Sequence, residues 1–351
     1  MDYNSKIDKT ILGAVAVIFF VSSMILVFGL PGLFVSPDAV ANFVFSSRLA
    51  EFNQLSLFEP LNMTFNDGLF PRSTFSLAGY ILPVSFVGLS VLYGLLGKIL
   101  GVGSVVLFTP ILAAMALFAW RGVVEKLFNS RIALIASILL AAHPAWWYYT
   151  ARGMMHNVLF MCLLIFAVWF LVVRPWEKAR CWPHAASRYF DVICAGLLLG
   201  LALFVRASEI VWVAAAIIII VVFYAKKIKW PEVILFGLAT VIALLPMFFI
   251  NNSLYGDPLS FGYVAQGEGV TEVSKVSDVV EAVEVSNVSE VTSTVLPFGF
   301  DLRSVMKHVY QYGFGLFWWM SILTLLGLGY SVVKKKYWLF HVLFIVVGAW
   351  L

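Results

Sequence analysis

Apolar residues in this chain gather into ten runs, most of them close to twenty residues long, with short polar segments between them. A helix of roughly 20 apolar residues crosses the hydrocarbon core of a bilayer, and a helix satisfies its own backbone hydrogen bonds there. The pattern therefore predicts an all-α polytopic membrane protein. The runs are Ile11–Leu30, Gly79–Leu100, Gly103–Trp120, Ile132–Tyr149, Met154–Val173, Val192–Val205, Ile210–Ala225, Val233–Ile250, Phe314–Val333 and Trp338–Leu351.

Composition agrees with this class, because 62% of the residues are hydrophobic and only 12% are charged. The net charge is +4, but the basic residues lie in short clusters between the apolar runs, so we expect no nucleic-acid partner. The three cysteines, Cys162, Cys181 and Cys194, lack the spacing of metal ligands. We expect neither a disulfide framework nor a zinc site.

Five basic clusters indicate how the runs cross the membrane, because cytoplasmic loops are enriched in Lys and Arg. If the N-terminus is cytoplasmic and Gly79–Leu100 does not cross, all five clusters are cytoplasmic and nine runs span the membrane. The rival arrangement, an external N-terminus with ten spans, misplaces only the first cluster but puts Asp38 in the cytoplasm. The clusters are Lys6 and Lys9; Arg121, Lys126 and Arg131; Arg174, Lys178, Arg180 and Arg188; Lys226, Lys227 and Lys229; and Lys334–Lys336.

The preferred topology describes a single transmembrane domain, residues 1–351, with two large external loops. The first loop, residues 31–102, is predicted to hold an interfacial helix and a re-entrant segment, Gly79–Leu100, in which several glycines and Pro83 weaken a continuous helix. The second loop, residues 251–313, contains the low-complexity stretch Val270–Val295, a solvated acidic linker or a lid over bound substrate.

Two further expectations depend on this topology. The last run is too short to span, so we expect the chain to be cut within a helix or to end in a short one. Three glycosylation sequons begin at Asn62, Asn251 and Asn287, and all three fall outside.

The stretch Ser36–Pro60 is the first polar segment after a span. Ser36 can cap a helix, Pro37 suits the first helical position, and Asp38 then lies in the first turn, where the helix dipole favours an ionised carboxylate. Asp38 either only caps the helix or acts at the membrane surface as a base or metal ligand. The same loop also offers Glu51, Glu59 and Asp67, and two converging carboxylates could hold a divalent cation such as Mg²⁺ or Mn²⁺.

Three other external segments carry candidate residues. In His143–Asn157 the aromatic residues suit the interfacial belt, whereas Arg152 and His156 sit between two helices and suit a phosphate headgroup. Arg206, at a tight turn, either pairs with Glu209, reaches to lipid phosphate, or clamps the phosphate of a lipid-linked substrate.

The last of these segments, Asn251–Tyr263, ends a span with a Gly-Asp-Pro turn. The turn aims Tyr255 and Tyr263 at the membrane interface, where they could form a wall of a substrate site.

These stretches, in this order, resemble the GT-C class of integral membrane glycosyltransferases, in particular the branch of protein O-mannosyltransferases and the lipid A aminoarabinose transferase. SPDAVANF looks like the family's Asp motif after the first span. YYTARGMMHN is similar to a Tyr-Ser-Arg-x-x-Met-x-Asp stretch, and NNSLYGDPLSFGY is similar to a turn common in family members. Where the family stretch tends to end in Asp, this chain has Asn157.

The resemblance implies an inverting glycosyltransferase at the external face of the cell membrane, with a polyprenyl-phosphate sugar as donor and a glycan, lipid or protein as acceptor. Asp38 would be the catalytic acidic residue. Arg152, Arg206, His156, Tyr255 and Tyr263 are candidates for substrate binding. If a divalent cation takes part, Glu51, Glu59 or Asn157 could hold it, although Asn157 brings no charge.

Two alternatives from other classes remain. A transporter or flippase of lipid-linked saccharides would share the apolar bundle, but transporters place ionisable groups at mid-membrane, and here the polar residues collect at one face. A non-catalytic membrane partner with the same fold is the other alternative, since the family's acidic residue is replaced by Asn157.

Overall fold

The computed structural model describes residues 3–29, 34, 36–175, 184–224 and 229–266, together with isolated positions after residue 305. The chain divides into two compact units: one made of residues 1–207 and 229–280, the other of residues 208–228 and 281–351. Each unit is described by itself. The runs Phe314–Val333 and Trp338–Leu351, the stretch Val270–Val295, and both Asn287 and Cys181 lie outside the described residues.

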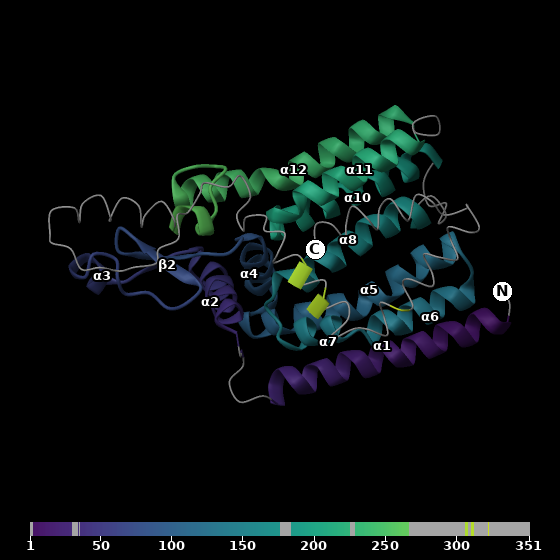
Figure 1. Cartoon of the computed structure of the whole chain (residues 1–351), viewed down its shortest axis with the longest axis horizontal. Coiled ribbons are helices and arrows are strands. Elements are labelled where there is room, and N and C mark those ends of the chain that lie inside the picture. The colour runs from purple at the N-terminus through teal and green to yellow at the C-terminus, as the bar shows by residue number, and fades with distance from the viewer. Residues whose placement is uncertain are drawn as a thin grey trace. The chain divides into compact units, whose positions relative to one another are not determined.

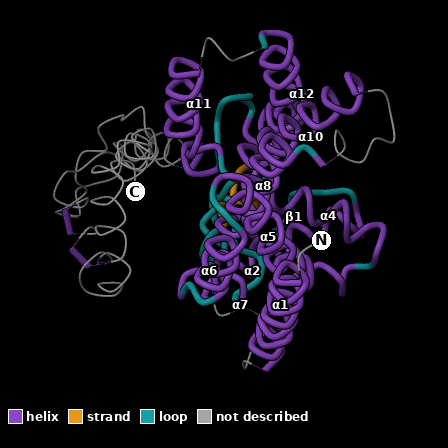
Figure 2. The backbone as a smooth tube through the Cα atoms, turned by 90° about the vertical axis from the view of Figure 1, so that its right-hand side faces the viewer, coloured by secondary structure: helices purple, strands orange, loops and turns teal. Residues whose placement is uncertain are grey.

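Helices dominate the first unit, which confirms the prediction of a helical membrane protein (Figure 1; helices are purple in Figure 2). Among the described residues, five helices are long and apolar enough to span a bilayer, and a bent pair could add a sixth. The predicted total of nine spans stays a prediction. The five helices are α1 (Tyr3–Gly29), α5 (Val105–Leu127), α8 (His156–Val173), α10 (His184–Val205) and α12 (Trp230–Tyr255).

The run Ile132–Tyr149, predicted as one helix, is divided into α6 (Ser130–Ala141) and α7 (Pro144–Ala151), which are bent by 50° relative to each other. Pro144 stands at the first position of α7, and His143 Nδ1 caps this helix by accepting the N–H of Ala145 at 3.2 Å. Proline cannot continue a helix without losing a backbone hydrogen bond, which accounts for the break.

The run Gly79–Leu100 is not one helix either. It contains strand β3 (Tyr80–Pro83) and helix α4 (Gly88–Leu100). At 13 residues, α4 is shorter than the roughly 20 residues that a span needs. The run therefore lacks a continuous spanning helix, which agrees with the topology that places all five basic clusters in the cytoplasm.

The first loop also contains a small sheet, which the expectation of an all-α chain did not include. Strand β3 lies between β1 (Leu57–Phe58) and β2 (Thr74–Leu77), and both pairings are antiparallel. Helix α2 (Pro37–Phe52) precedes the sheet in sequence, and the short α3 (Pro60–Thr64) lies between β1 and β2. Asp67 closes the loop, because its carboxylate accepts hydrogen bonds from Ser76 Oγ at 2.6 Å and Gly79 N at 2.7 Å.

Two of the three glycosylation sequons have a buried asparagine in the folded chain. The side chain of Asn62 is 1% exposed, and its amide both donates to the carbonyl of Leu69 and accepts from the N–H of Leu69. Asn251 is equally buried, next to the turn at Pro258. A sequon identifies only a short sequence, whereas modification needs an accessible amide nitrogen.

Close helix contacts in the first unit depend on small residues. Gly196 and Gly200 lie four residues apart on α10, and a Cβ atom on either would come within 2.4 Å of a backbone carbonyl oxygen of α12. Glycines at this spacing let membrane helices approach until their backbones touch. Helix α10 also packs against α8, and α8 against α5.

Charged residues tie the helices together at the end of the bundle where α1 begins. The buried Arg121 donates to Glu125 at 2.9 Å and to Ser130 Oγ at 3.0 Å, and Ser130 donates to Asp8 at 2.6 Å. A second group joins α8, α10 and α12, because Arg174 and Arg188 both pair with Glu232. These arginines belong to the clusters that the charge rule assigns to the cytoplasm.

The predicted topology can be tested by cysteine labelling in a cysteine-free variant. Thr64 and Lys126 are both exposed side chains, one in the first loop and one at the end of α5. We expect a membrane-impermeant maleimide to label Thr64→Cys in intact cells, and Lys126→Cys only after permeabilisation. Labelling of Thr64→Cys only in permeabilised cells would favour the rival orientation.

Candidate functional site

The site begins with α2, whose start follows the sequence prediction. Ser36 is extended (φ −101°, ψ 134°), Pro37 is the first helical residue, and Asp38 lies in the first turn. The Ser36 side chain makes no capping hydrogen bond, so that detail of the prediction is wrong. The Asp38 carboxylate instead accepts a hydrogen bond through Oδ1 from the hydroxyl of Ser73, which precedes β2.

Asn42 holds α2 in place, a role that the sequence analysis missed. It is 1% exposed, and its Nδ2 donates to the carbonyl of Met154 at 2.8 Å, while its Oδ1 accepts from Ser85 Oγ at 3.3 Å. Asn42 lies one turn after Asp38, so these bonds fix Asp38 against the segment that leads into α8. A polar residue on the buried face, between Ala41 and Phe45, was the signal in the sequence.

His156 and Asn157, at the start of α8, face the end of α10. Asn157 Oδ1 accepts a hydrogen bond from Arg206 Nη1 at 3.0 Å. His156 Nε2 lies 2.7 Å from the carbonyl oxygen of Phe86, and because a carbonyl only accepts, Nε2 carries the proton in this contact. Glu209, the alternative partner considered for Arg206, belongs to the second unit, where it accepts a hydrogen bond from Trp212.

The negative charge of Asp38 and the positive charge of Arg206 both act electrostatically on His156 and on Tyr263. Burial raises the pKa of the Tyr263 phenol; the negative charge of Asp38 raises it further, and Arg206 acts in the opposite direction. Because the pKa of Tyr263 lies above its ordinary value, the phenol stays protonated at neutral pH and is able to donate a hydrogen bond. The structure thus brings residues from four distant stretches into one site.

Two glycines allow this convergence. A Cβ atom on Gly88 would come within 2.3 Å of the carbonyl oxygen of Phe204, and one on Gly262 would come equally close to that of Pro83. The end of α10 and the segment after α12 therefore pack directly on the connection between β3 and α4. Phe86, in this connection, makes edge contacts with His156 and Tyr263.

Arg152 and Tyr255, two of the residues predicted to bind substrate, make contacts within the protein. The guanidinium group of Arg152 lies over the ring of Tyr148, 4.2 Å from its centroid. The hydroxyl of Tyr255 donates to the carbonyl of Pro83 at 2.9 Å and so supports β3. Their roles in substrate binding stay predictions.

The predicted metal ligands do not form a shared site. Glu59 caps α3 by accepting the N–H of Leu61 at 3.2 Å, and Glu51 is exposed, roughly 20 Å from Asp38 along α2. Asn157 is bonded to Arg206. Within the described part of the chain, no three His, Cys, Asp or Glu side chains are placed to hold a metal ion. Among the described residues, Glu51, Glu59 and Asn157 therefore do not come together as ligands of one divalent cation.

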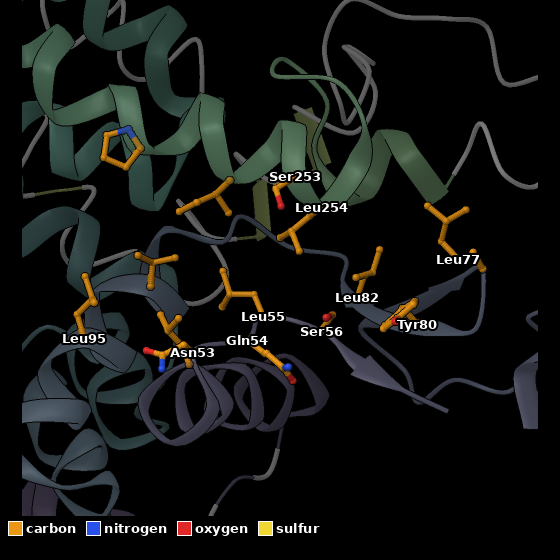
Figure 3. A pocket seen from close by; sticks show the side chains of 15 residues that line it. Asn53, Gln54, Leu55, Ser56, Leu77, Tyr80, Leu82, Leu95, Ser253 and Leu254 are labelled. Atoms are coloured by element: carbon orange, nitrogen blue, oxygen red, sulfur yellow. The ribbon is translucent and has the colours of Figure 1, made fainter. Parts of the chain in front are cut away.

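A groove with a volume of about 790 Å³ opens between α2, α4, the β2–β3 hairpin and α12 (Figure 3). Leu49, at its near edge, is eleven residues after Asp38, roughly 16 Å along α2. Most of the lining is aliphatic, and its polar residues include Asn53, Gln54 and Ser253. The aliphatic residues are Leu49, Leu55, Leu77, Leu82, Val91, Leu95, Ile250 and Leu254.

The fold and the site define the class of protein: a polytopic helical membrane protein with a polar, charged site at one end of the bundle. Residues 86–250, a little under half of the chain, match the family model of dolichyl-phosphate-mannose-protein mannosyltransferases. The matched segment includes His156, Asn157 and Arg206. The match confirms the resemblance to membrane glycosyltransferases and supports the prediction of an enzyme.

The fold was also compared with solved structures. The oligosaccharyltransferase of Archaeoglobus fulgidus in its apo form is 15% identical with a TM-score of 0.49, over 93% of this chain and 39% of that enzyme. The same enzyme tethered to an acceptor peptide containing the NVT sequon is 15% identical with a TM-score of 0.47, over 86% of this chain and 38% of that chain. The chain thus spans about two fifths of the length of that enzyme. No curated protein sequence matches the chain.

We expect Asn42→Leu to lower the free energy of unfolding by about 1–3 kcal/mol, because it leaves the Met154 carbonyl and the Ser85 hydroxyl buried without their partner. Thermal unfolding of the detergent-solubilised protein measures the change. Asn252→Leu is the matched control, since Asn252 is exposed and such surface changes usually cost less than about 0.5 kcal/mol. Equal effects of the two substitutions would contradict the role of Asn42.

Proposed function

We propose that the protein is a membrane glycosyltransferase that transfers a sugar from a polyprenyl-phosphate donor to an acceptor at the external face of the membrane. The observation that carries this proposal is the convergence of Asp38, His156, Arg206 and Tyr263 at one end of the bundle. A site that holds a carboxylate, a guanidinium group and a phenol suits a reaction in which a proton leaves the acceptor and charge builds on a departing phosphate.

In the proposed reaction Asp38 is the base. Its carboxylate accepts the proton of an acceptor hydroxyl or nitrogen while that atom forms a bond to C1 of the sugar. The bond between C1 and the phosphate oxygen breaks at the opposite face, so the configuration at C1 inverts. The electron pair leaves with the polyprenyl phosphate, and Asp38 holds the proton until it passes to solvent.

Arg206 would stabilise the leaving phosphate. Asn157 is neutral, so its hydrogen bond with Arg206 does not offset the positive charge of the guanidinium group. An aspartate at this position would pair with Arg206 and reduce its attraction for a phosphate. The protonated phenol of Tyr263 adds a hydrogen-bond donor to the same site.

The groove in Figure 3 would hold part of the prenyl chain. It begins at the far end of α2 from Asp38, and its lining is mostly aliphatic. Its α12 residues, Pro246 to Leu254, come from the last part of a candidate span, which places the groove near the end of an apolar helix. A long apolar chain attached to a phosphate near Arg206 could run along α2 into it.

External placement of the site rests on charge. The arginines at the opposite end, Arg121, Arg174 and Arg188, belong to the clusters that the positive-inside rule assigns to the cytoplasm. Nucleotide sugars are cytoplasmic donors, and a lipid-linked donor supplies the sugar at the other face.

Asp38→Asn tests the proposed base. We expect it to reduce the transfer of radiolabelled mannose from polyprenyl-phosphate mannose in isolated membranes by at least about a hundredfold, since general-base catalysis contributes factors of this size. Glu125→Gln, which changes a carboxylate at the opposite end of the bundle, should retain transfer. Full activity of Asp38→Asn at equal protein levels would overturn the proposal.

Leu95→Trp tests the groove, since the indole would fill space in which the prenyl chain is proposed to lie. We expect the KM for a long-chain donor to rise about tenfold, equivalent to roughly 1.4 kcal/mol of binding, and the KM for a short-chain donor to stay unchanged. Leu96→Trp is the matched control, because Leu96 is the next residue of α4, is also exposed, and does not line the groove. An equal change for both donors would argue against the groove as the chain site.

A further inference from the structure

Ser73 contacts the proposed base and was not among the candidates from the sequence. It lies in the first loop, 35 residues after Asp38, and its hydroxyl donates a hydrogen bond to Asp38 Oδ1. The inference drawn from this contact rests on the proposed function, because it concerns how the carboxylate of Asp38 is presented to the acceptor.

The backbone of Ser73 has a conformation that few residues adopt. Its φ is +69°, in the left-handed region, where a residue with a Cβ atom is strained and glycine is not. Strained residues in folded proteins gather at functional sites. A serine at this position therefore suggests that the side chain has a functional role, which offsets the conformational strain of the backbone.

The turn around Ser73 is held by other bonds. Thr74 Oγ1 and Thr74 N donate to the carbonyl of Pro71 at 2.6 and 3.2 Å, and Thr74 pairs with Pro83 across β2 and β3. The loop is closed further along by Asp67. The hydroxyl of Ser73 takes no part in these bonds, so its contact with Asp38 is not needed to build the turn.

We infer that Ser73 is a positioning residue for the proposed glycosyl transfer. By donating to Oδ1, its hydroxyl fixes the orientation of the Asp38 carboxylate and leaves Oδ2 as the oxygen that accepts the proton of the acceptor. The first turn of α2 sets the position of the Asp38 backbone, and Ser73 sets the rotation of its carboxyl group. Small errors in such placement lower catalytic rates strongly.

Ser73→Gly separates this role from a structural one, because glycine removes the hydroxyl and also relieves the left-handed backbone. We expect the Tm in detergent to equal or exceed that of the wild type. The kcat for sugar transfer should fall about tenfold to a hundredfold, and the KM for the donor should stay within about twofold.

Two further variants complete the experiment. Ser73→Asn should recover part of the lost kcat, because asparagine tolerates the left-handed region and its amide can donate to the carboxylate. Ser76→Gly is the matched control: Ser76 bonds to Asp67 rather than to Asp38, so its loss should lower the Tm while the folded protein keeps its kcat.

Wild-type kcat in Ser73→Gly would overturn the inference, as would a fall in kcat that is matched by a fall in Tm. Intact-mass measurement of the wild type provides another check, because a sugar attached to Ser73 would make this hydroxyl an acceptor rather than a positioning group. These results are distinct from a failure of the proposed function. If Asp38→Asn keeps full activity, the base itself is wrong; if only Ser73→Gly does, the base stands and Ser73 has no part in it.

Discussion

The buried amide of Asn42 is the interaction on which the rest of the site depends. It joins α2 to the carbonyl of Met154 and to Ser85, and so to two segments far away in the sequence. These bonds fix the angle at which α2 meets the segment before α8. Because Asp38 lies one turn from Asn42, its distance from His156 and Arg206 follows from this docking. A buried polar contact of this kind gives a specific register that apolar packing alone would not.

The two ends of the bundle use charge differently. At the end where α1 begins, Glu125 neutralises Arg121 within α5, and the pairs of Glu232 with Arg174 and Arg188 join α12 to α8 and α10. At the other end, Arg206 is bonded to a neutral amide, and Asp38 accepts from a neutral hydroxyl. In the proposed reaction, Arg206 attracts the phosphate of the donor and Asp38 takes up the proton of the acceptor.

Several features followed from the sequence for clear physical reasons. Long apolar runs gave the helices, Pro37 gave the start of α2, and the basic clusters indicated that Gly79–Leu100 lacks a spanning helix. Other expectations failed because they rested on local sequence alone. The strand at Tyr80–Pro83 and the burial of Asn62 result from contacts with other segments of the first loop, whereas the break at Pro144 is local and follows from proline and the His143 cap. Ser73 was missed because an isolated serine in a loop has no distinctive pattern, and Asn42 was missed although it is a polar residue on the buried face of α2.

The sequence by itself determined the class of protein, the helices of the bundle and the short list of charged residues at one face, since the cost of burying charge in lipid leaves few places for them. Only the tertiary structure decided which of these residues meet. Close approach at Gly88 and Gly262 brought Asp38, His156, Arg206 and Tyr263 together, and left Glu51 and Glu59 apart. Helix periodicity determines on which face of a helix a residue lies. Which helix faces pack against each other depends on backbone contacts between segments more than a hundred residues apart in the chain.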